Sequence, residues 1–498
     1  MAKTDLTIPN KGIPRKDLLQ RLGTLASQDV DFKGNRVFGL VYQLSDEHTD
    51  FLKAAHGQFF SANGLNPMAF KSLKRMESDV VRMTASLFNG GNGVVGTLTS
   101  GGTESILLAV LAYREHARRH RPWVLRPEII VPASAHAAFY KAGQYFDVKI
   151  VRAPLDKDFR ADVNAVRKRI NWKTIAIVAS APCYPYGVID PVQELAQLAA
   201  ARGIGMHVDA CLGGYLLPFV GRLPADQRPC DIPPFDFGVP GVTSMSADVH
   251  KYGYAAKGAS TLLYRNMDYL KHQFSVETEW CGGVYVSPTL AGTRPGGAIA
   301  GAWAALNAIG EDGYLANAAN LMQVTRTYLE GIRQTPGLCI LGNPVMSVLS
   351  FGAAKGGPDI YAVGDFLEAR GWHIDRIQNP AGLHLILNPG HAGVAAAWLA
   401  DLREGVAYVL AHPEAAAEGS APMYGMIAKL PLRGLVKKNV LAFMQRMYSD
   451  EDVDSVLSSS GTEEDGSATG GATDDGVPLI LRKLLRAKAR LTKFRERF

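Results

Sequence analysis

Residues 174–210 read TIAIVASAPCYPYGVIDPVQELAQLAAARGIGMHVDA, and this stretch decides the fold class. It contains a continuous apolar run at 174–179, a segment with helical spacing of its apolar residues at 191–202, and a second apolar run at 205–208 that ends at Asp209. Short apolar runs without alternation are typical of strands that are buried on both faces. Two such strands joined by a helix predict a parallel strand–helix–strand unit.

The same rhythm continues on both sides of this unit, so we expect an α/β fold with a mostly parallel seven-stranded sheet covered by helices on both faces. From about residue 316 the pattern changes to that of a smaller C-terminal α+β domain. The expected strands of the large domain include 128–132, 149–152, 244–247 and 260–264, and its expected helices include 73–87, 103–119 and 161–170. The small domain is expected to contain a long helix through Ile332, strands at 347–351 and 383–388, and helices at 359–369 and 394–411.

Length and composition set the outer limits of this prediction. A chain of 498 residues is too long for one ordinary core. We expect an N-terminal arm (1–62), a large domain (63–315), a small domain (316–449), a disordered acidic linker (450–478) and a basic tail (479–498). No apolar run approaches the roughly 18–20 residues that span a bilayer, and the start MAKTDLTIPNKG has no signal-peptide character, so we expect a cytoplasmic protein. The five cysteines are scattered, and neither disulfides, a metal site nor a nucleic-acid partner is expected.

Four motifs follow predicted strands, at the sheet edge where α/β proteins bind ligands. The glycine turn Gly101–Gly102 with Thr103 begins a helix and suits an anion such as phosphate, although a simple helix cap is the commoner explanation of such a turn. Asp209 ends a strand, where a plain turn-capping role is also common. Lys251 lies in SADVHKYGYAAKG, where partial desolvation would favour reaction with an aldehyde, although most lysines are only solvated surface charges. His136 lies in SAHAAF, where a structural role is the commoner explanation of a lone histidine, although an imidazole can also stack on a cofactor ring.

The ordered motifs SGGTES, SAHAAF, HVDACLGG, SADVHKYGYAAKG and SPTLAGTRPGG resemble those of the decarboxylases that depend on pyridoxal-5′-phosphate (PLP). These enzymes have the aspartate-aminotransferase fold, which is fold type I of the PLP-dependent transferases. Within the group, the chain is most similar to the sphingosine-1-phosphate lyase family. The similarity runs from about Arg36 to Tyr448 and includes Gly187–Pro191 and Tyr424–Met426.

The resemblance implies a role for each motif in a PLP site. Lys251 would hold the cofactor as a Schiff base, Asp209 would pair with its pyridine nitrogen, and His136 would stack on its ring. The phosphate would lie near Gly101, Gly102, Thr103 and His250, with Cys211 and Thr293 also in the cofactor site. Tyr252 or a water molecule is a candidate proton carrier.

The resemblance also implies a second site, for the phosphate of the substrate. Tyr42 and Lys257 match the tyrosine and lysine that hold it in the family. An Asn/His pair of the family corresponds to Asn63 and Asn66, so an amide replaces the histidine here. An amide can donate a hydrogen bond to phosphate but cannot carry a positive charge, which puts substrate affinity or its pH dependence in doubt.

The implied activity is cleavage of a phosphorylated sphingoid base to a fatty aldehyde and phosphoethanolamine. An L-amino-acid decarboxylase with the same cofactor site is the alternative, although Lys257 and Tyr42 would have no obvious task there. A catalytically silent scaffold is the other alternative. Retention of Lys251, Asp209 and His136 together argues against it.

Two further expectations concern assembly and the end of the chain. The resemblance implies a homodimer in which Tyr42 and Thr293 are donated across the interface. The tail carries eight Lys or Arg and one Glu, after a stretch with nine acidic residues and no Lys or Arg. A helix would place its apolar residues on one stripe, which suits an anionic membrane surface or, equally, a solvated helix or a docking segment. These residues are Ile480, Leu484, Ala487, Leu491, Phe494 and Phe498.

Overall fold

The computed structural model describes residues 7–27, 29–417 and 433–448. By its internal contacts the chain divides into two units, Met1–Pro431 and Leu432–Phe498. The described part of the second unit is helix α14 (Arg433–Met447) with Tyr448. The acidic linker, the basic tail and the motif Tyr424–Met426 lie outside the described residues, so the expectations placed on them remain predictions.

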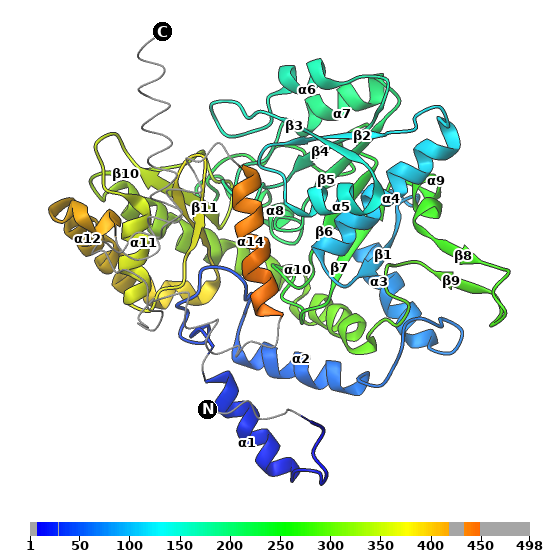
Figure 1. The fold of residues 1–498 in the computed structure, drawn as a ribbon, viewed down its shortest axis with the longest axis horizontal. Helices are drawn as coiled ribbons and strands as arrows, with labels where there is room; N and C mark the ends of the chain where they lie inside the picture. The colour runs from blue at the N-terminus through cyan, green and yellow to red at the C-terminus, as the bar shows by residue number, and fades with distance from the viewer. Residues whose placement is uncertain (1–6, 28, 418–432, 449–498) are drawn as a thin grey trace, which may run out of the picture. The chain divides into compact units, whose positions relative to one another are not determined.

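A seven-stranded sheet forms the centre of the first unit (Figure 1). Strands β3, β2, β4, β5 and β6 are parallel, while β7 runs antiparallel to both β6 and β1. The prediction of a mostly parallel seven-stranded sheet is therefore confirmed, and β1 is the strand that the apolar pattern did not single out, because its sequence VGTLT is not a continuous apolar run. In spatial order the strands are β1 (Val95–Thr99), β7 (Ser260–Tyr264), β6 (Ser244–Ala247), β5 (Gly205–Asp209), β4 (Thr174–Ser180), β2 (Glu128–Pro132) and β3 (Lys149–Ala153).

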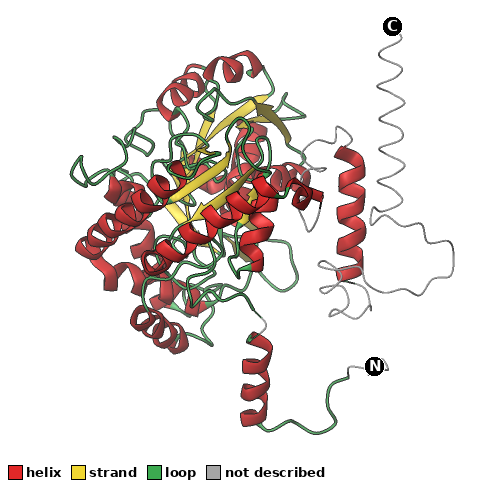
Figure 2. Cartoon of the chain, turned by 90° about the vertical axis from the view of Figure 1, so that its left-hand side faces the viewer, coloured by secondary structure: helices red, strands yellow, loops and turns green. Residues whose placement is uncertain are grey.

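Helices cover both faces of this sheet (Figure 2), which explains why its strands are apolar at successive positions. Alternate residues of β2 belong to different cores. Ile129 packs with Ile106 of the helix that follows β1, whereas Ile130 packs with Leu195 of the helix between β4 and β5. The helices of this domain are α3 (Lys71–Leu87), α4 (Gly102–His120), α5 (Ala138–Phe146), α6 (Val163–Arg169), α7 (Val192–Ala201), α8 (Leu217–Val220), α9 (Met267–Leu270) and α10 (Gly296–Arg333).

The smaller C-terminal α+β part is also confirmed. Its four antiparallel strands lie in the order β10-β11-β13-β12, and the long predicted helix through Ile332 is the C-terminal half of α10, which is interrupted at Gly310 with φ of 64°. The buried rings of Trp372 and Trp398 fill its core together with Phe38 of the N-terminal arm. The elements are β10 (Leu338–Ile340), β11 (Val348–Ala353), α11 (Ile360–Ala369), β12 (Asp375–Ile377), β13 (Gly382–Ile386) and α12 (Ala395–Ala411), with 3-10 turns η2 (Pro389–Val394) and η3 (Pro413–Ala417).

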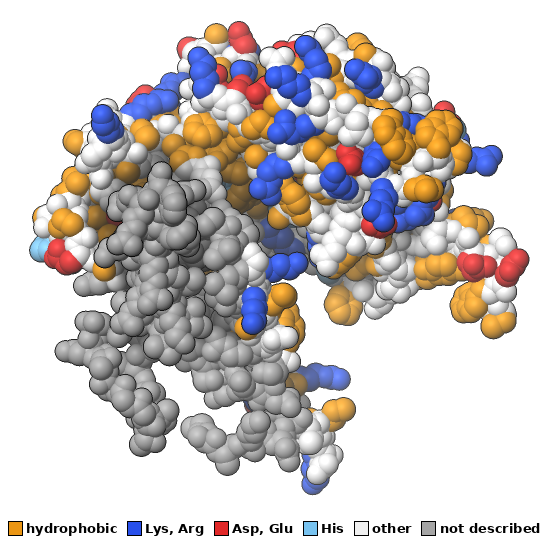
Figure 3. All heavy atoms as spheres, turned by 45° about the horizontal axis from the view of Figure 1, so that its top comes forward, with side chains coloured by type: hydrophobic (Ala, Val, Ile, Leu, Met, Phe, Trp, Pro, Cys, Tyr) orange, Lys and Arg blue, Asp and Glu red, His pale blue; other side chains and the backbone are white. Residues whose placement is uncertain are grey.

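Two peripheral elements complete the first unit. The N-terminal arm forms α1 (Arg15–Ala26) and α2 (Asp46–Gln58), and a two-stranded hairpin, β8 (Ser275–Glu277) and β9 (Tyr285–Ser287), follows the 3-10 turn η1 (Lys271–Gln273). The hairpin projects at the right of Figure 3 and carries hydrophobic and acidic side chains. Among the described helices, none is long and apolar enough to cross a bilayer.

Candidate functional site

A cavity of about 360 Å³ opens at the edge of the large sheet where the parallel strands end. Ser180 ends β4, Asp209 ends β5 and Asp248 follows β6, and all three contribute to its wall. The structure therefore brings together residues from motifs that lie far apart in the sequence. Of the predicted cofactor residues, the cavity is lined by Gly101, Gly102, Thr103, His136, Asp209, Cys211, His250 and Lys251, but not by Thr293.

The glycine turn allows the start of α4 to pass close to the opposite wall. A Cβ atom on Gly102 would lie 2.7 and 2.9 Å from the two carboxylate oxygens of Asp248 and 2.9 Å from Sγ of Cys211. The turn is held by Glu104, which accepts a hydrogen bond from the backbone N–H of Ser100 at 2.6 Å. Free N–H groups and the positive end of the helix dipole are thus directed at the cavity, as an anion requires.

Asp209 presents a buried carboxylate to the cavity. Its Oδ1 accepts hydrogen bonds from the backbone N–H of Cys211 at 3.1 Å and from the hydroxyl of Ser246 at 3.4 Å. The same hydroxyl lies 3.2 Å from Nε2 of His207, and burial lowers the pKa of His207 to about 4. The imidazole behind Asp209 is therefore neutral at physiological pH and does not form an ion pair with the Asp209 carboxylate.

Lys251 reaches the cavity from the turn after β6 and is paired with an acidic residue that we did not single out from the sequence. Its Nζ lies 3.0 Å from Oδ2 of Asp248. Burial disfavours the ammonium ion, but the Asp248 carboxylate outweighs it and raises the pKa of Lys251 above its usual value. The available signal was the Asp-x-x-Lys spacing in SADVHK, which brings the two side chains together in a single turn.

Two histidines contribute to the wall. His136 follows β2, and its Nδ1 accepts a hydrogen bond from the backbone N–H of Ala138 at 3.2 Å. His250 lies 3.7 Å from Asp248, and its buried Nδ1 makes no hydrogen bond within the described part of the chain. Burial lowers the pKa of His250 despite the nearby carboxylate. A buried ring nitrogen without a partner beside the glycine turn is available to a ligand.

Tyr184 is a further wall residue that the sequence patterns did not indicate. Its hydroxyl donates to Oδ2 of Asp375 on β12 at 2.7 Å, and its ring stacks on His384 of β13 at 4.2 Å. Burial, followed by the Asp375 charge, raises the pKa of Tyr184. Only the docking of the small sheet against the loop after β4 creates this part of the wall, so no local motif could have predicted it.

Tyr252 is next to Lys251 in the chain but is not in the cavity wall. Its buried hydroxyl donates to the carbonyl of Leu387 at 3.0 Å and accepts from the hydroxyl of Ser347 at 2.7 Å. These bonds hold the phenol in the core between the two sheets. The expectation that Tyr252 carries a proton gains no support from this arrangement.

Lys257 and Tyr42 of the same chain lie together, as the predicted substrate-phosphate site requires, so the expected donation of Tyr42 across a dimer interface gains no support. Nζ of Lys257 lies 5.1 Å from the centre of the Tyr42 ring and donates to the carbonyl of Leu40 at 2.6 Å. Lys257 is partly exposed, but desolvation and the positive charge of Lys251 lower its pKa to about 8. Burial, followed by the Asp248 charge, raises the pKa of Tyr42. The charges of Lys251 and Asp248 thus act on Lys257 and Tyr42, although neither of these two residues lines the cavity.

Asn63 and Thr293 also come together, although the two are far apart in the sequence. Nδ2 of Asn63 lies 3.4 Å from the Thr293 hydroxyl, and Oδ1 accepts from the backbone N–H of Arg294 at 3.1 Å. Asn66 uses its oxygen to accept from two backbone N–H groups, at 3.0 and 3.1 Å, and so caps its own turn. Its NH₂ group is the part that can serve a phosphate.

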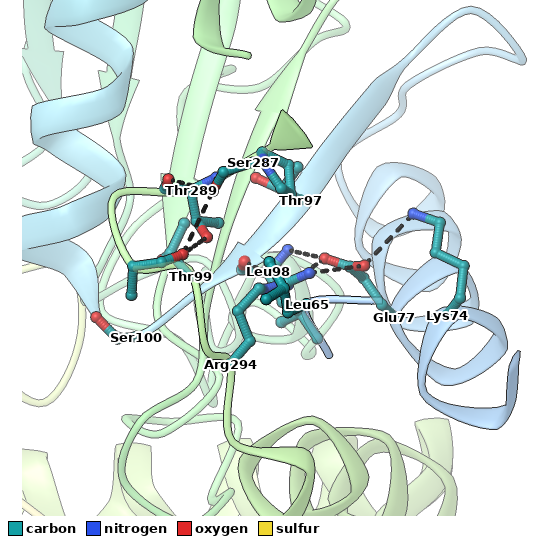
Figure 4. Close-up of polar contacts among 12 residues, drawn as sticks. Leu65, Lys74, Glu77, Thr97, Leu98, Thr99, Ser100, Ser287, Thr289 and Arg294 are labelled. Atoms are coloured by element: carbon teal, nitrogen blue, oxygen red, sulfur yellow. Dashed lines mark hydrogen bonds and ion pairs between the residues drawn. The ribbon is translucent and has the colours of Figure 1, made fainter. Parts of the chain in front are cut away.

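A buried ion pair fixes this segment against α3 (Figure 4). Arg294 pairs with Glu77, and it also donates to the carbonyl of Leu98 at 3.0 Å. Glu77 in turn accepts from the backbone N–H of Leu98 at 3.1 Å. The ammonium of Lys74 lies 3.4 Å from Glu77 on the solvent side. The segment that carries Thr293 is thus held by α3 and by β1, and β1 leads directly into the glycine turn.

Comparison with known proteins gives a consistent result. The family model of the pyridoxal-dependent decarboxylase conserved domain matches residues 61–354. The chain is 44% identical over 454 residues to a sphingosine-1-phosphate lyase of Arabidopsis thaliana, covering 90% of this chain and 81% of the relative. It is 41% identical to sphingosine-1-phosphate lyase 1 of Rattus norvegicus, covering 90% and 78%. The solved structure of a sphingosine-1-phosphate lyase of Burkholderia pseudomallei matches with a TM-score of 0.77 at 39% identity, covering 86% and 98%.

Proposed function

The chain belongs to the pyridoxal-dependent decarboxylase family and, within it, to the sphingosine-1-phosphate lyases, and from this premise we propose that it cleaves a phosphorylated long-chain base into a fatty aldehyde and phosphoethanolamine. The observation that carries this proposal is the convergence on one cavity of the Lys251 amine, the Asp209 carboxylate and the glycine turn, and the contact between Lys257 and Tyr42 supports it.

The residues of the cavity fit PLP. A volume of about 360 Å³ lies within the range of about 300–1,000 Å³ typical of small-ligand sites. Gly102 lets the start of α4 come so close to Asp248 and Cys211 that a Cβ there would overlap them, and the unpaired Nδ1 of His250 lies beside this turn. An amine, a buried carboxylate and an anion-binding helix start are the groups that an aldehyde, a pyridine nitrogen and a phosphate respectively require.

We assign the cofactor contacts accordingly. Lys251 would bind the aldehyde carbon, Asp209 would accept the hydrogen bond of the protonated pyridine nitrogen, and His136 would lie against the ring. The phosphate would be held by the start of α4 at Gly101–Thr103, with His250 as a further donor. Cys211 lines the same wall. When bound, PLP supplies an acceptor for the electrons that remain on Cα as the Cα–Cβ bond breaks.

The residues that orient the substrate determine which bond of Cα breaks. A cation at Lys257 and a hydroxyl at Tyr42 can hold a phosphate at one end of the substrate, and a pKa of about 8 keeps Lys257 mostly protonated at neutral pH. Asn63 and the NH₂ group of Asn66 would add hydrogen bonds without charge. When the phosphate is held in place, the rotation of the substrate about Cα is also fixed. This rotation decides which bond of Cα is perpendicular to the plane of the cofactor ring and therefore breaks.

The proton of the Cβ hydroxyl must leave as the bond to Cα breaks. Because the Tyr252 hydroxyl is engaged by Ser347 and Leu387, we assign Tyr252 a packing role. A water molecule in the cavity is the remaining candidate to accept that proton.

The alternative activity is decarboxylation of an amino acid at the same cofactor site, and the products distinguish the two. Purified protein loaded with PLP should release phosphoethanolamine and a fatty aldehyde from sphingosine-1-phosphate. Its release of carbon dioxide from aspartate, glutamate or tyrosine should be negligible. Carbon dioxide without aldehyde would leave the cofactor assignment intact and reject the lyase activity.

We further propose that the enzyme acts as a homodimer. Thr293 does not line the cavity of its own chain, which supports a task for it at the site of a second subunit. The projecting β8–β9 hairpin also exposes large apolar residues, since Val276, Trp280 and Val284 are 60%, 56% and 71% exposed. Light scattering coupled to size-exclusion chromatography tests this directly, and a monomeric mass at micromolar concentration would reject it.

A further inference from the structure

The buried ion pair between Asp248 and Lys251 stands out among the ion pairs of the described chain that involve a lysine. The side chain of Asp248 is 1% exposed and that of Lys251 is 21% exposed, whereas the comparable Asp268–Lys271 pair is 72% and 48% exposed. Both pairs have the same Asp-x-x-Lys spacing, and their N–O distances are 3.0 and 3.1 Å. One pair is in the cofactor cavity and the other is in water.

Asp248 is held by backbone hydrogen bonds and by the close approach of Gly102. Its backbone N–H donates to the carbonyl of Cys211 at 3.3 Å, and its carbonyl accepts from the backbone N–H of Lys251 at 3.1 Å. The backbone of Gly102 comes so close that a Cβ there would overlap both carboxylate oxygens. Oδ1 of Asp248 is buried and makes no hydrogen bond among the described residues. Such a carboxylate depends on neighbouring positive charge for its stability.

The groups that face Lys251 explain why Asp248 dominates its electrostatics. Asp248 is the nearest charge, and burial is the main opposing effect. The mutual attraction lowers the pKa of Asp248 although burial would raise it, so both partners are charged at neutral pH. The other titratable groups around Lys251 are Asp209 and Cys211 from the end of β5, His250 and Lys257 from its own turn, and Tyr184 from the loop after β4.

We propose that Asp248 is a positioning residue for Lys251. Asp248 holds the lysine as an ammonium ion directed into the cavity, and it thereby sets the pH at which the Lys251 amine becomes free to capture the cofactor. Asp209 is the separate carboxylate that faces the cofactor ring. The two acidic residues of this sheet edge thus have different tasks, one on the lysine and one on the pyridine nitrogen. The proposal deepens the proposed function, since it takes Lys251 as the amine that holds PLP.

The chemistry gives the direction of the effect. An ammonium ion must first lose a proton to solvent, after which the amine attacks the aldehyde carbon, a C–N bond forms and water leaves. A carboxylate 3.0 Å away opposes the first of these steps. Replacing Asp248 by asparagine removes the charge but keeps the size of the side chain. The amine should then become free at lower pH, while its position in the cavity becomes less well defined.

The test measures the reactivity of Lys251 in the full-length chain after removal of PLP. Acetic anhydride labelling, read by peptide mass spectrometry over a pH series, gives the midpoint at which Lys251 becomes reactive. We expect the pH midpoint of Lys251 labelling to fall by at least one pH unit in Asp248→Asn. At a pH below both midpoints, this shift corresponds to labelling that is about tenfold faster. Asp248→Glu keeps the charge and should retain most of the original midpoint.

The exposed pair supplies the matched control. Asp268→Asn removes a carboxylate at the same spacing from a lysine, and it should leave the labelling profile of Lys251 unchanged. Thermal melting of each variant shows whether the fold is intact. If Asp248→Asn melts like the original protein and its Lys251 profile is unshifted, the proposal is overturned. If Asp248→Asn does not fold, Asp248→Glu decides, because a large downward shift of the Lys251 midpoint in that folded variant contradicts the proposal.

A second readout uses the cofactor without any substrate. The absorption band that appears as PLP binds to Lys251 should form at lower pH in Asp248→Asn than in the original chain, and equal pH profiles would count against the proposal. Neither readout depends on the lyase reaction. Loss of the proposed function would show as missing fatty aldehyde with a normal Lys251 profile, so the two failures are distinguishable.

Discussion

Gly102→Ala should weaken both the fold and the cofactor site, because the glycine turn passes within contact distance of two buried groups. The new Cβ would meet the Asp248 oxygens at 2.7 and 2.9 Å and Sγ of Cys211 at 2.9 Å. These atoms belong to short, buried side chains that cannot swing away, so the start of α4 must shift by several tenths of an ångström. Overpacking of this kind costs about 1–3 kcal/mol in free energy of unfolding.

The same shift should reduce PLP affinity at least about tenfold, which corresponds to about 1.4 kcal/mol, since the N–H groups of the turn move relative to the phosphate. Urea unfolding of the PLP-free protein measures the first effect, and titration with PLP measures the second. Gly57→Ala is the matched control, because its Cβ meets nothing within 4 Å and lies inside α2. It should stabilise the protein by up to about 1 kcal/mol and leave PLP affinity unchanged. A Gly102→Ala protein with unaltered stability and affinity would refute the reasoning.

Four further predictions follow from the site and its supports. Lys251→Ala should abolish the absorption band that forms on addition of PLP, and an unchanged spectrum in that variant would reject the assignment of Lys251. The KM for sphingosine-1-phosphate should rise as the pH passes upward through about 8, because only protonated Lys257 pairs with the phosphate. Lys257→Met should raise KM at neutral pH and remove this pH dependence. A variant that keeps the pH dependence of KM would contradict the role of Lys257. Arg294→Met should lower the free energy of unfolding, measured in urea, by about 3–5 kcal/mol, because it leaves buried Glu77 unpaired. This loss should shrink at low pH. Arg294 lowers the pKa of Glu77, so the stabilisation is present above the pKa of Glu77 in the unfolded chain and disappears as Glu77 takes up a proton in the folded protein. Deletion of residues 479–498, which lie outside the described chain, should reduce binding to anionic vesicles at low salt more than at high salt, and equal binding at both would favour a solvated helix.

The sequence by itself was enough to determine the order of elements and the chemistry at the ends of the strands. Continuous apolar runs, as at 174–179, predict strands that are buried on both faces, and this prediction does not require knowledge of the elements that cover them. Helical spacing of the apolar residues between these runs predicts the helices that connect one parallel strand to the next. A parallel sheet then brings the ends of its strands to one edge, so Asp209 and Lys251 could be expected near each other. Strand β1 escaped this pattern because its sequence VGTLT is not a continuous apolar run, although it pairs with β7 in the sheet.

The tertiary structure alone decided which neighbours these groups have. The approach of Gly102 to Asp248, the contribution of Tyr184 to the cavity through Asp375, and the contact between Asn63 and Thr293 each join segments from different parts of the chain. Local patterns do not encode such contacts, because they arise from the packing of whole elements. The charge of a buried group depends on the atoms within a few ångströms, so the charged state of Lys251 became definable only when Asp248 was placed beside it.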